Sequence, residues 1–164
     1  GLMTGRMGFE MDIIFDVDGT LMNVDHRRKF VDGSQKKDWK AFVEAIHLDT
    51  PIWPVVHLAL GMQDQHTIIV VSGRNEAQRD ITEKQLNALG IQYDTLRMRP
   101  DGDYEPDYVV KEIILDGLIE DGFSPEMAFD DRPSVCAMWR KRGLTCFQLD
   151  GDITPYGDVR SDFK

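Results

Sequence analysis

The sequence predicts a single α/β domain built on a parallel β-sheet with helices on both faces. Strand-like and helix-like segments alternate along most of the chain, which is the order that such a sheet requires. The segment TIIVV (residues 67–71) is apolar and mostly β-branched, as expected for a strand buried on both faces. The chain has 164 residues and 41% of them are hydrophobic, which suits one domain with a substantial core.

The first half of the chain supplies three predicted strands and two predicted helices. Residues 12–15 form an apolar strand that leads directly into two aspartates. Residues 54–65 have apolar side chains at helical spacing and begin with Pro54, a favoured first helical residue. After the TIIVV strand, residues 75–90 form a helix that Asn75 can cap and Gly90 can end. Residues 93–98 then form a short strand.

The second half continues the alternation. Residues 106–122 form an amphipathic helix, and residues 126–131 form a strand that ends in acids. Residues 132–143 form a helix with Pro133 in its first turn, and residues 144–149 form the final strand.

Residues 21–53 interrupt this alternation. They contain a polar, hairpin-like stretch and a short helix candidate, DWKAFVEAI. We expect this insertion after the first strand to lie over the carboxyl edge of the sheet as a flap or small cap. We expect residues 11–164 to form one domain, and residues 1–10 to be a leader that is disordered or derived from an expression vector.

Composition and charge narrow the class of protein. The net charge of −10 argues against broad binding of long nucleic acids through their phosphates. No apolar run is long enough to span a membrane, and no segment resembles a signal peptide. Cys136 and Cys146 lack zinc-site spacing, so we expect two reduced thiols in a cytoplasmic protein that contacts no membrane.

The predicted strand ends carry polar side chains. Ligands of open α/β sheets bind at the carboxyl ends of the strands, so these side chains are expected to meet there. Three strand ends and the helix of residues 106–122 contribute Asp16, Asp18, Ser72, Gly73, Arg74, Lys111, Asp130 and Asp131.

Clustered carboxylates repel one another unless a cation lies among them, and hard oxygen ligands suit Mg²⁺. The expected metal-binding set is Asp16, Val17, Asp130 and Asp131, in which we expect Asp131 to be a direct ligand and Asp130 to support it. A simpler interpretation of the last two residues is a helix N-cap before Pro133.

The same residues can perform phosphoryl transfer. Asp16 can attack phosphorus and form an aspartyl phosphate. Asp18 can protonate the leaving oxygen and then deprotonate water. Ser72 and the N–H groups of a turn at Ser72 and Gly73 can bind phosphoryl oxygens, and Lys111 supplies positive charge. An Asp-rich structural turn is the alternative. An EF-hand calcium loop is excluded, since its sixth and twelfth positions would be Leu21 and Arg27.

Four motifs in order, DVDGT, VVSGR, the lysine of VVKE and FDDR, resemble those of haloacid dehalogenase-like (HAD) phosphatases. The resemblance covers residues 12–149 and implies a HAD-type, Rossmann-like three-layer sandwich with a mostly parallel central sheet. The chain is also similar to the 3′-phosphatase domain of phage polynucleotide kinase/phosphatase, through FDVDGTL with Arg27 downstream, DYVVKE, MWRKRGLTCFQ and a closing GDI.

This closer resemblance implies further site residues. It implies that Arg27 and Arg74 contact the substrate phosphate and that Asp107 is required. Asp107 and Lys111 are four residues apart on the predicted helix, so an ion pair that orients the lysine is expected. Arg28 is a close rival of Arg27.

Other details of substrate contact stay open. Arg97 and Arg99 are either substrate contacts or solvated charges, and Trp39 is a candidate for base stacking. The chain has no P-loop motif, so no kinase half is expected, and residues 21–53 are longer than the equivalent segment in the two-domain enzyme.

The expected function is that of a Mg²⁺-dependent phosphomonoesterase that removes 3′-phosphates from polynucleotide ends. A small-molecule 5′(3′)-nucleotidase and a non-catalytic phosphate- or nucleic-acid-binding module are the alternatives. The substrate is therefore a nucleic-acid 3′-phosphate end or a nucleotide, and the sequence points to no protein partner.

Overall fold

A five-stranded sheet forms the middle layer of the computed structural model, which describes residues 8–33 and 36–149. Its strand order is β5-β4-β1-β6-β7, and all four pairings are parallel. The strand bounds are β1 (Asp12–Phe15), β4 (Thr67–Asn75), β5 (Thr95–Arg99), β6 (Pro125–Asp130) and β7 (Thr145–Gln148). The strand order reverses at β1, which is where open α/β sheets bind ligands.

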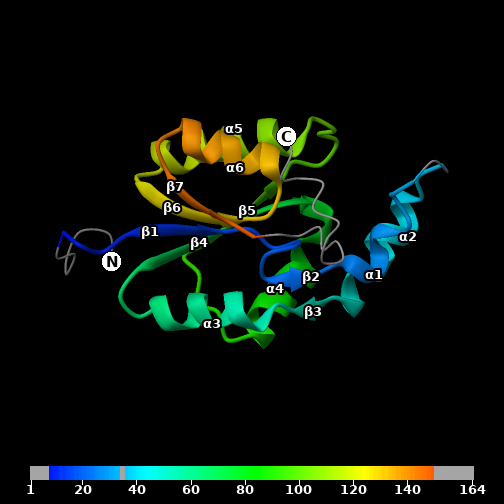
Figure 1. The fold of residues 1–164 in the computed structure, drawn as a ribbon, viewed down its shortest axis with the longest axis horizontal. Helices are drawn as coiled ribbons and strands as arrows, with labels where there is room; N and C mark the ends of the chain where they lie inside the picture. The colour runs from blue at the N-terminus through cyan, green and yellow to red at the C-terminus, as the bar shows by residue number, and fades with distance from the viewer. Residues whose placement is uncertain (1–7, 34–35, 150–164) are drawn as a thin grey trace, which may run out of the picture.

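Helices cover both faces of this sheet (Figure 1). On one face lie α3 (Trp53–Met62) and α4 (Arg79–Ala88), and on the other lie α5 (Asp107–Glu120) and α6 (Pro133–Lys141). Each face has its own apolar core. Ile13 and Phe15 of β1 belong to the first core and Ile14 to the second, so this central strand is buried throughout.

This arrangement confirms the predicted fold class. The mostly parallel sheet, the two helical layers and an insertion after the first strand are all present. The insertion contains β2 (Met22–Asn23), α1 (Asp25–Arg28), α2 (Trp39–Glu44), the 3-10 helix η1 (Ala45–Leu48) and β3 (Thr50–Pro51). Its two strands pair in antiparallel orientation, and Figure 1 shows α1 and α2 beyond the end of β1.

Two predicted boundaries were wrong. The strand predicted over residues 67–71 continues through Ser72, Gly73 and Arg74 to Asn75, because β4 resumes pairing with β5 after a register shift between Ser72 and Asn75. The predicted turn at Ser72 and Gly73 is therefore a bulged strand end. The helix predicted over residues 75–90 begins as a 3-10 helix, η2 (Glu76–Gln78), before α4. Its cap is as predicted, since the Asn75 side chain accepts a hydrogen bond from Ala77 N.

Some predictions concern residues outside the described ranges. Most of the predicted leader (residues 1–7) and the closing GDI motif lie there. Within residues 8–33 and 36–149, no helix is both long enough and apolar enough to cross a membrane.

Candidate active site

Three carboxylates meet at the carboxyl end of the central strands. Asp16 directly follows β1 and its backbone N–H donates to Phe129 O of β6 at 3.0 Å. Asp130 is the last residue of β6 and Asp131 follows it. One carboxylate oxygen from each of these residues lies within 4.8 Å of the others. Residues more than a hundred positions apart in the sequence therefore meet at one edge of the sheet, as the order of the strands leads one to expect.

Lys111 is the cation of this cluster. It lies on α5, is 2% exposed, and its Nζ donates to Asp16 Oδ1 at 2.7 Å and to Asp130 Oδ2 at 3.0 Å. The other oxygen of Asp16, Oδ2, accepts a hydrogen bond from Thr20 Oγ1 at 2.9 Å. Both oxygens of the predicted nucleophile are thus held by hydrogen-bond donors, which fixes the orientation of its carboxylate.

Asp130 is tied into the surrounding structure. Its Oδ1 accepts from the backbone N–H groups of Asp131 (2.8 Å) and Arg132 (3.3 Å). Its Oδ2 accepts from Trp139 Nε1 at 3.2 Å as well as from Lys111. The helix α6 has Arg132 at its N-cap and no side-chain cap bond, so the simple N-cap interpretation of the two acids is not what the structure shows. Asp130 instead organises the loop that carries Asp131.

The electrostatics of the cluster favour a bound cation. Burial and the neighbouring Asp130 raise the pKa of Asp16 well above its usual value, although Lys111 opposes this. Burial also raises the pKa of Asp131. The pKa of Lys111, which burial alone would lower, is raised by Asp130 and Asp16. One ammonium therefore does not compensate three carboxylates fully, and hard oxygen donors of this kind suit a dication such as Mg²⁺.

Val17 belongs to the expected metal-binding set, but its side chain lies in the apolar core and is fully buried. Its carbonyl oxygen accepts from the backbone N–H groups of Thr20, Leu21 and Met22 at 2.9–3.2 Å. Within this turn, Gly19 has a φ of +82°, which favours glycine. Val17 thus shapes the loop that carries Asp16 and Asp18.

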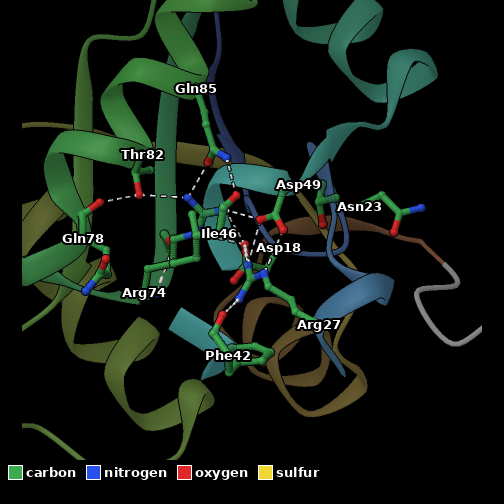
Figure 2. A network of polar contacts seen from close by, with 12 residues as sticks. Asp18, Asn23, Arg27, Phe42, Ile46, Asp49, Arg74, Gln78, Thr82 and Gln85 are labelled. Atoms are coloured by element: carbon green, nitrogen blue, oxygen red, sulfur yellow. Dashed lines mark hydrogen bonds and ion pairs between the residues drawn. The ribbon is translucent and has the colours of Figure 1, made fainter. Parts of the chain in front are cut away.

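Asp18 lies at the same edge and is held by two arginines (Figure 2). Its Oδ1 is 2.9 Å from Arg74 Nε, 2.8 Å from Arg74 Nη2 and 3.1 Å from Arg27 Nη2. Burial would raise the pKa of Asp18, but Arg74 and Arg27 outweigh it and hold the pKa below its usual value. The side chain remains 30% exposed, so it can still reach a substrate.

Arg27 and Arg74, which the resemblance implies contact the substrate phosphate, are paired with carboxylates in this structure. Arg27 is fully buried and Arg74 is 6% exposed. Besides Asp18, both contact the buried carboxylate of Asp49, and Nη1 of Arg74 donates to Thr82 and Gln85. Their role as phosphate contacts stays a prediction, and their visible role is to hold Asp18.

Ser72 and Gly73 lie on the bulged end of β4, beside β1. Register pairs Phe15 with Val70, so Ser72 lies level with the residues that follow β1. Ser72 is 1% exposed and its Oγ accepts from Arg74 N at 3.1 Å, within the bulge. Gly73 is closely approached: a Cβ added there would lie 2.8 Å from Asp107 Oδ1. A side chain at this position would push Asp107 aside.

The expected ion pair between Asp107 and Lys111 was wrong. The two residues are on α5, but Lys111 turns to Asp16 and Asp130. The Asp107 carboxylate pairs with Arg99 and, at 3.3 Å, with Arg132 Nε. Lys111 pairs with Asp16 and Asp130 and not with its helical neighbour Asp107, because a buried ammonium needs carboxylates that are buried with it. Asp107 therefore holds the start of α5 against the bulge of β4.

Arg99, Arg97 and Arg28 each contact other parts of the protein, and whether they contact substrate stays open. Arg99 Nε donates to Gly73 O at 2.9 Å and its Nη1 donates to Asp103 O at 3.1 Å, so it ties the loop before α5 to β4. Arg97 pairs with Asp121 at 2.9 Å. Arg28 is half-buried, pairs with Asp25 at 2.9 Å and lies 3.9 Å from Asp131 Oδ2.

Trp39 of α2 is 56% exposed, with Lys37 Nζ 5.5 Å from its ring centroid. Base stacking by Trp39 stays a prediction.

Sequence reasoning missed several residues of this site: Thr20, Asp49, Thr82, Gln85 and Trp139. Trp139 reads as a packing residue from its helical spacing, and it is indeed fully buried, but its indole N–H also anchors Asp130. Asp49 lies in the mostly apolar stretch AIHLDTPIW (residues 45–53), outside the four motifs. Thr20 is part of the DVDGT motif and lies four residues from its partner Asp16, so the motif offers a local signal for it. Asp49 has no such signal, because its partners Arg27 and Arg74 are 22 and 25 positions away.

Comparison with known proteins gives a family match and several structural matches. The model of the polynucleotide kinase PNKP phosphatase domain matches residues 10–152. A solved Pnkp1/Rnl/Hen1 complex contains a chain with 30% sequence identity and a TM-score of 0.70, covering 86% of this chain and 46% of that one. A second structure, of the Pnkp1/Rnl/Hen1 RNA repair complex, matches at 29% identity and a TM-score of 0.69, covering 87% and 43% of the two chains. The chain thus spans slightly less than half the length of these two relatives.

A more distant match supports the fold alone. A HAD family enzyme from Bacteroides thetaiotaomicron, solved with magnesium and inorganic phosphate, shares 13% identity with a TM-score of 0.55. It covers 90% of this chain and 98% of its own.

Proposed function

The chain belongs to the family of polynucleotide kinase PNKP phosphatase domains, and from this premise we propose that it is a Mg²⁺-dependent polynucleotide 3′-phosphatase. The observation that carries the proposal is the buried carboxylate of Asp16, oriented by Lys111 and Thr20 within a cluster of three acids. One relative is part of a complex described as an RNA repair complex, which favours a nucleic-acid end as substrate.

In the first proposed step, a carboxylate oxygen of Asp16 attacks phosphorus and the bond from phosphorus to the 3′-oxygen breaks. Against the effect of burial, Arg74 and Arg27 lower the pKa of Asp18 in the free protein, and the anionic phosphate bound beside it is proposed to raise that pKa again, so that Oδ2, the oxygen outside the arginine contacts, carries a proton. Asp18 gives this proton to the leaving oxygen, and the phosphoryl group stays on Asp16 as an aspartyl phosphate. Lys111 lies 2.7 Å from Asp16 Oδ1 and therefore supplies positive charge where the phosphoryl group binds. Ser72 and the backbone of the β4 bulge lie beside this position and are proposed to bind phosphoryl oxygens.

In the second step, water attacks the aspartyl phosphate, Asp18 accepts the proton of that water, and inorganic phosphate leaves. Asp16, Asp130 and Asp131 would hold the Mg²⁺ ion, with Asp130 oriented by Trp139. When bound, this ion neutralises the acids and the phosphate charge. Phosphoryl transfer depends chiefly on such positioning and electrostatic stabilisation.

A mononucleotidase is the second candidate. The net charge of −10 and the insertion beyond the end of β1 both fit a small substrate better than a long polyanion. A non-catalytic binding module is disfavoured, because a pure binder does not need a nucleophile and a general acid two residues apart.

The test offers the protein four substrates with Mg²⁺ or EDTA: a 3′-phosphorylated oligonucleotide, a nucleoside 3′-monophosphate, a nucleoside 5′-monophosphate and an aryl phosphate. The proposal expects fastest turnover of the oligonucleotide, loss of turnover in EDTA, and a rate that falls with salt. Faster turnover of a mononucleotide would support the second candidate.

Asp16→Asn should abolish activity while leaving the circular dichroism spectrum unchanged. Asp25→Asn, an exposed acid of the insertion, is the control and should retain wild-type rates. Wild-type rates in Asp16→Asn would remove Asp16 as the nucleophile.

A further inference from the structure

Asp49 is a buried acid of the insertion that lies between the two arginines of the site (Figure 2). It directly follows η1, and its side chain has no solvent exposure. Its Oδ1 accepts from Arg27 Nε at 2.8 Å, and its Oδ2 accepts from Arg27 Nη2 at 2.9 Å and Arg74 Nη2 at 3.0 Å. Nε2 of His26, whose side chain is partly exposed, lies 2.7 Å from the same Oδ1 atom of Asp49.

The same two arginine nitrogens also hold Asp18. Nη2 of Arg27 lies 3.1 Å from Asp18 Oδ1, and Nη2 of Arg74 lies 2.8 Å from it. The four groups thus form a ring in which carboxylates and guanidinium groups alternate: Asp18, Arg74, Asp49 and Arg27. Every contact that the ring makes with Asp18 is to Oδ1, so the ring fixes that oxygen and with it the direction of the other one.

Other contacts hold the arginines in this ring. The guanidinium of Arg27 lies over the ring of Phe42 at 4.4 Å. Nη1 of Arg74 donates to Thr82 Oγ1 at 2.9 Å and to Gln85 Oε1 at 2.7 Å. Gln85 in turn donates to Ile46 O of the insertion at 2.9 Å. The ring therefore joins the insertion to β4 and α4, and Asp49 is the insertion's charged contribution to it.

Two buried guanidinium groups need two carboxylates. Without Asp49, Arg27 and Arg74 would share the single oxygen of Asp18, and each would lose its second carboxylate partner. Unpaired buried charges rearrange or draw in water, so the position of Asp18 would no longer be defined. Asp49 does not lie in the acid cluster and is not placed to touch the phosphoryl group.

We infer that Asp49 is a positioning residue for the phosphatase reaction: through Arg27 and Arg74 it holds Asp18 in line with the leaving oxygen. This inference rests on the proposed function, in which Asp18 protonates that oxygen. It goes further in assigning the insertion a part in catalysis that depends on the leaving group.

The leaving group distinguishes positioning of a general acid from a structural role. A nucleoside 3′-oxygen leaves as an alkoxide and needs a proton, and general acid catalysis typically contributes about 10²–10⁴-fold to such a step. A nitrophenyl phosphate releases a stable phenolate and hardly needs the acid. Loss of Asp18 positioning should therefore slow the nucleotide substrate far more than the aryl substrate.

The experiment measures kcat and KM of wild type, Asp18→Asn, Asp49→Asn and the double variant on a 3′-phosphorylated oligonucleotide and on 4-nitrophenyl phosphate. Asp49→Asn should lower kcat for the oligonucleotide by about 10²-fold and for the aryl phosphate by less than about tenfold. The double variant should be little slower than Asp18→Asn, because both changes remove the same contribution. Asp25→Asn, another acid of the insertion, is the matched control and should resemble wild type.

Asp49→Glu keeps the charge and serves if Asp49→Asn does not fold. For Asp49→Glu, the ratio of kcat on the oligonucleotide to kcat on 4-nitrophenyl phosphate should lie between the ratios of wild type and Asp18→Asn. The inference is overturned if the Asp49 variant that folds slows both substrates equally, or if its effect multiplies with that of Asp18→Asn. If Asp18→Asn itself slows both substrates equally, the proposed role of Asp18 fails, and the inference fails with it for a different and visible reason.

Discussion

Replacing Lys111 by methionine tests the charge balance of the acid cluster, because methionine keeps the apolar stem of the side chain but removes its charge. Unit charges at the observed 2.7 Å and 3.0 Å attract by about 6 kcal/mol each at an effective dielectric constant of about 20. Desolvation of the ammonium offsets several kcal/mol of this, so we expect a net loss of about 3–5 kcal/mol in the free energy of unfolding. For a domain of this size, that corresponds to roughly 6–20 °C in Tm.

The measurement is urea and thermal denaturation of wild type and Lys111→Met in EDTA and in Mg²⁺. Without the ammonium, the already raised pKa of Asp16 rises further. The loss of stability should therefore be greatest above that pKa and shrink as pH falls and the carboxyl binds a proton. Mg²⁺ should stabilise the variant more than wild type, because it then replaces the positive charge that Lys111 supplies to Asp16 and Asp130.

Lys84→Met is the control, since Lys84 lies exposed on α4, and it should change stability by less than about 0.5 kcal/mol. A loss below about 1 kcal/mol for Lys111→Met in EDTA, or equal Mg²⁺ stabilisation of both proteins, would refute this account of the cluster.

Three further predictions concern the same edge of the sheet. Gly19→Ala would place a Cβ 2.1 Å from Asp131 Oδ2, so the affinity for Mg²⁺, measured by calorimetry, should fall at least about tenfold. Gly102→Ala is the control: its φ is nearly the same, but the space around it is open, so the affinity should not change. Trp139→Phe removes the N–H that donates to Asp130 Oδ2, which should cost about 1–3 kcal/mol in denaturant unfolding, and full wild-type stability would contradict the role of this hydrogen bond. Mg²⁺ at about 100-fold its Kd should stabilise the wild type by about 2.7 kcal/mol relative to EDTA, and a Tm that does not respond to Mg²⁺ would argue against a metal at the three acids.

The fold could be predicted because its signals are local. Apolar β-branched runs, helical spacing and turn residues identify the strands and helices, and their alternation fixes a parallel sheet. The rule that strand ends share one edge then brings Asp16, Asp130 and Asp131 together. The end of β4 could not be predicted, because the bulge after Ser72 depends on how β4 resumes pairing with β5.

The polar contacts within the site were harder to predict. The spacing of Asp107 and Lys111 favours a helical ion pair, yet the buried acids win, because the strength of an ion pair depends on burial that the sequence does not reveal. Arg27 and Arg74 lie beside Asp18, and their contact with the substrate phosphate stays a prediction, whereas their shared partner Asp49 was not expected at all. Its recognition requires knowing that Asp49 of the insertion lies against Arg74 of β4.

The acid cluster also has a consequence for the biogenesis of the protein. Lys111 and Asp16 are 95 positions apart, and Asp130 lies farther still along the chain. A nascent chain that has emerged from the ribosome only as far as the start of β6 still lacks Asp130 and Asp131, two of the three carboxylates that would bind the dication. Cation binding at the three acids therefore cannot precede the addition of β6 to the sheet, so the ion stabilises the protein only late in its synthesis and folding.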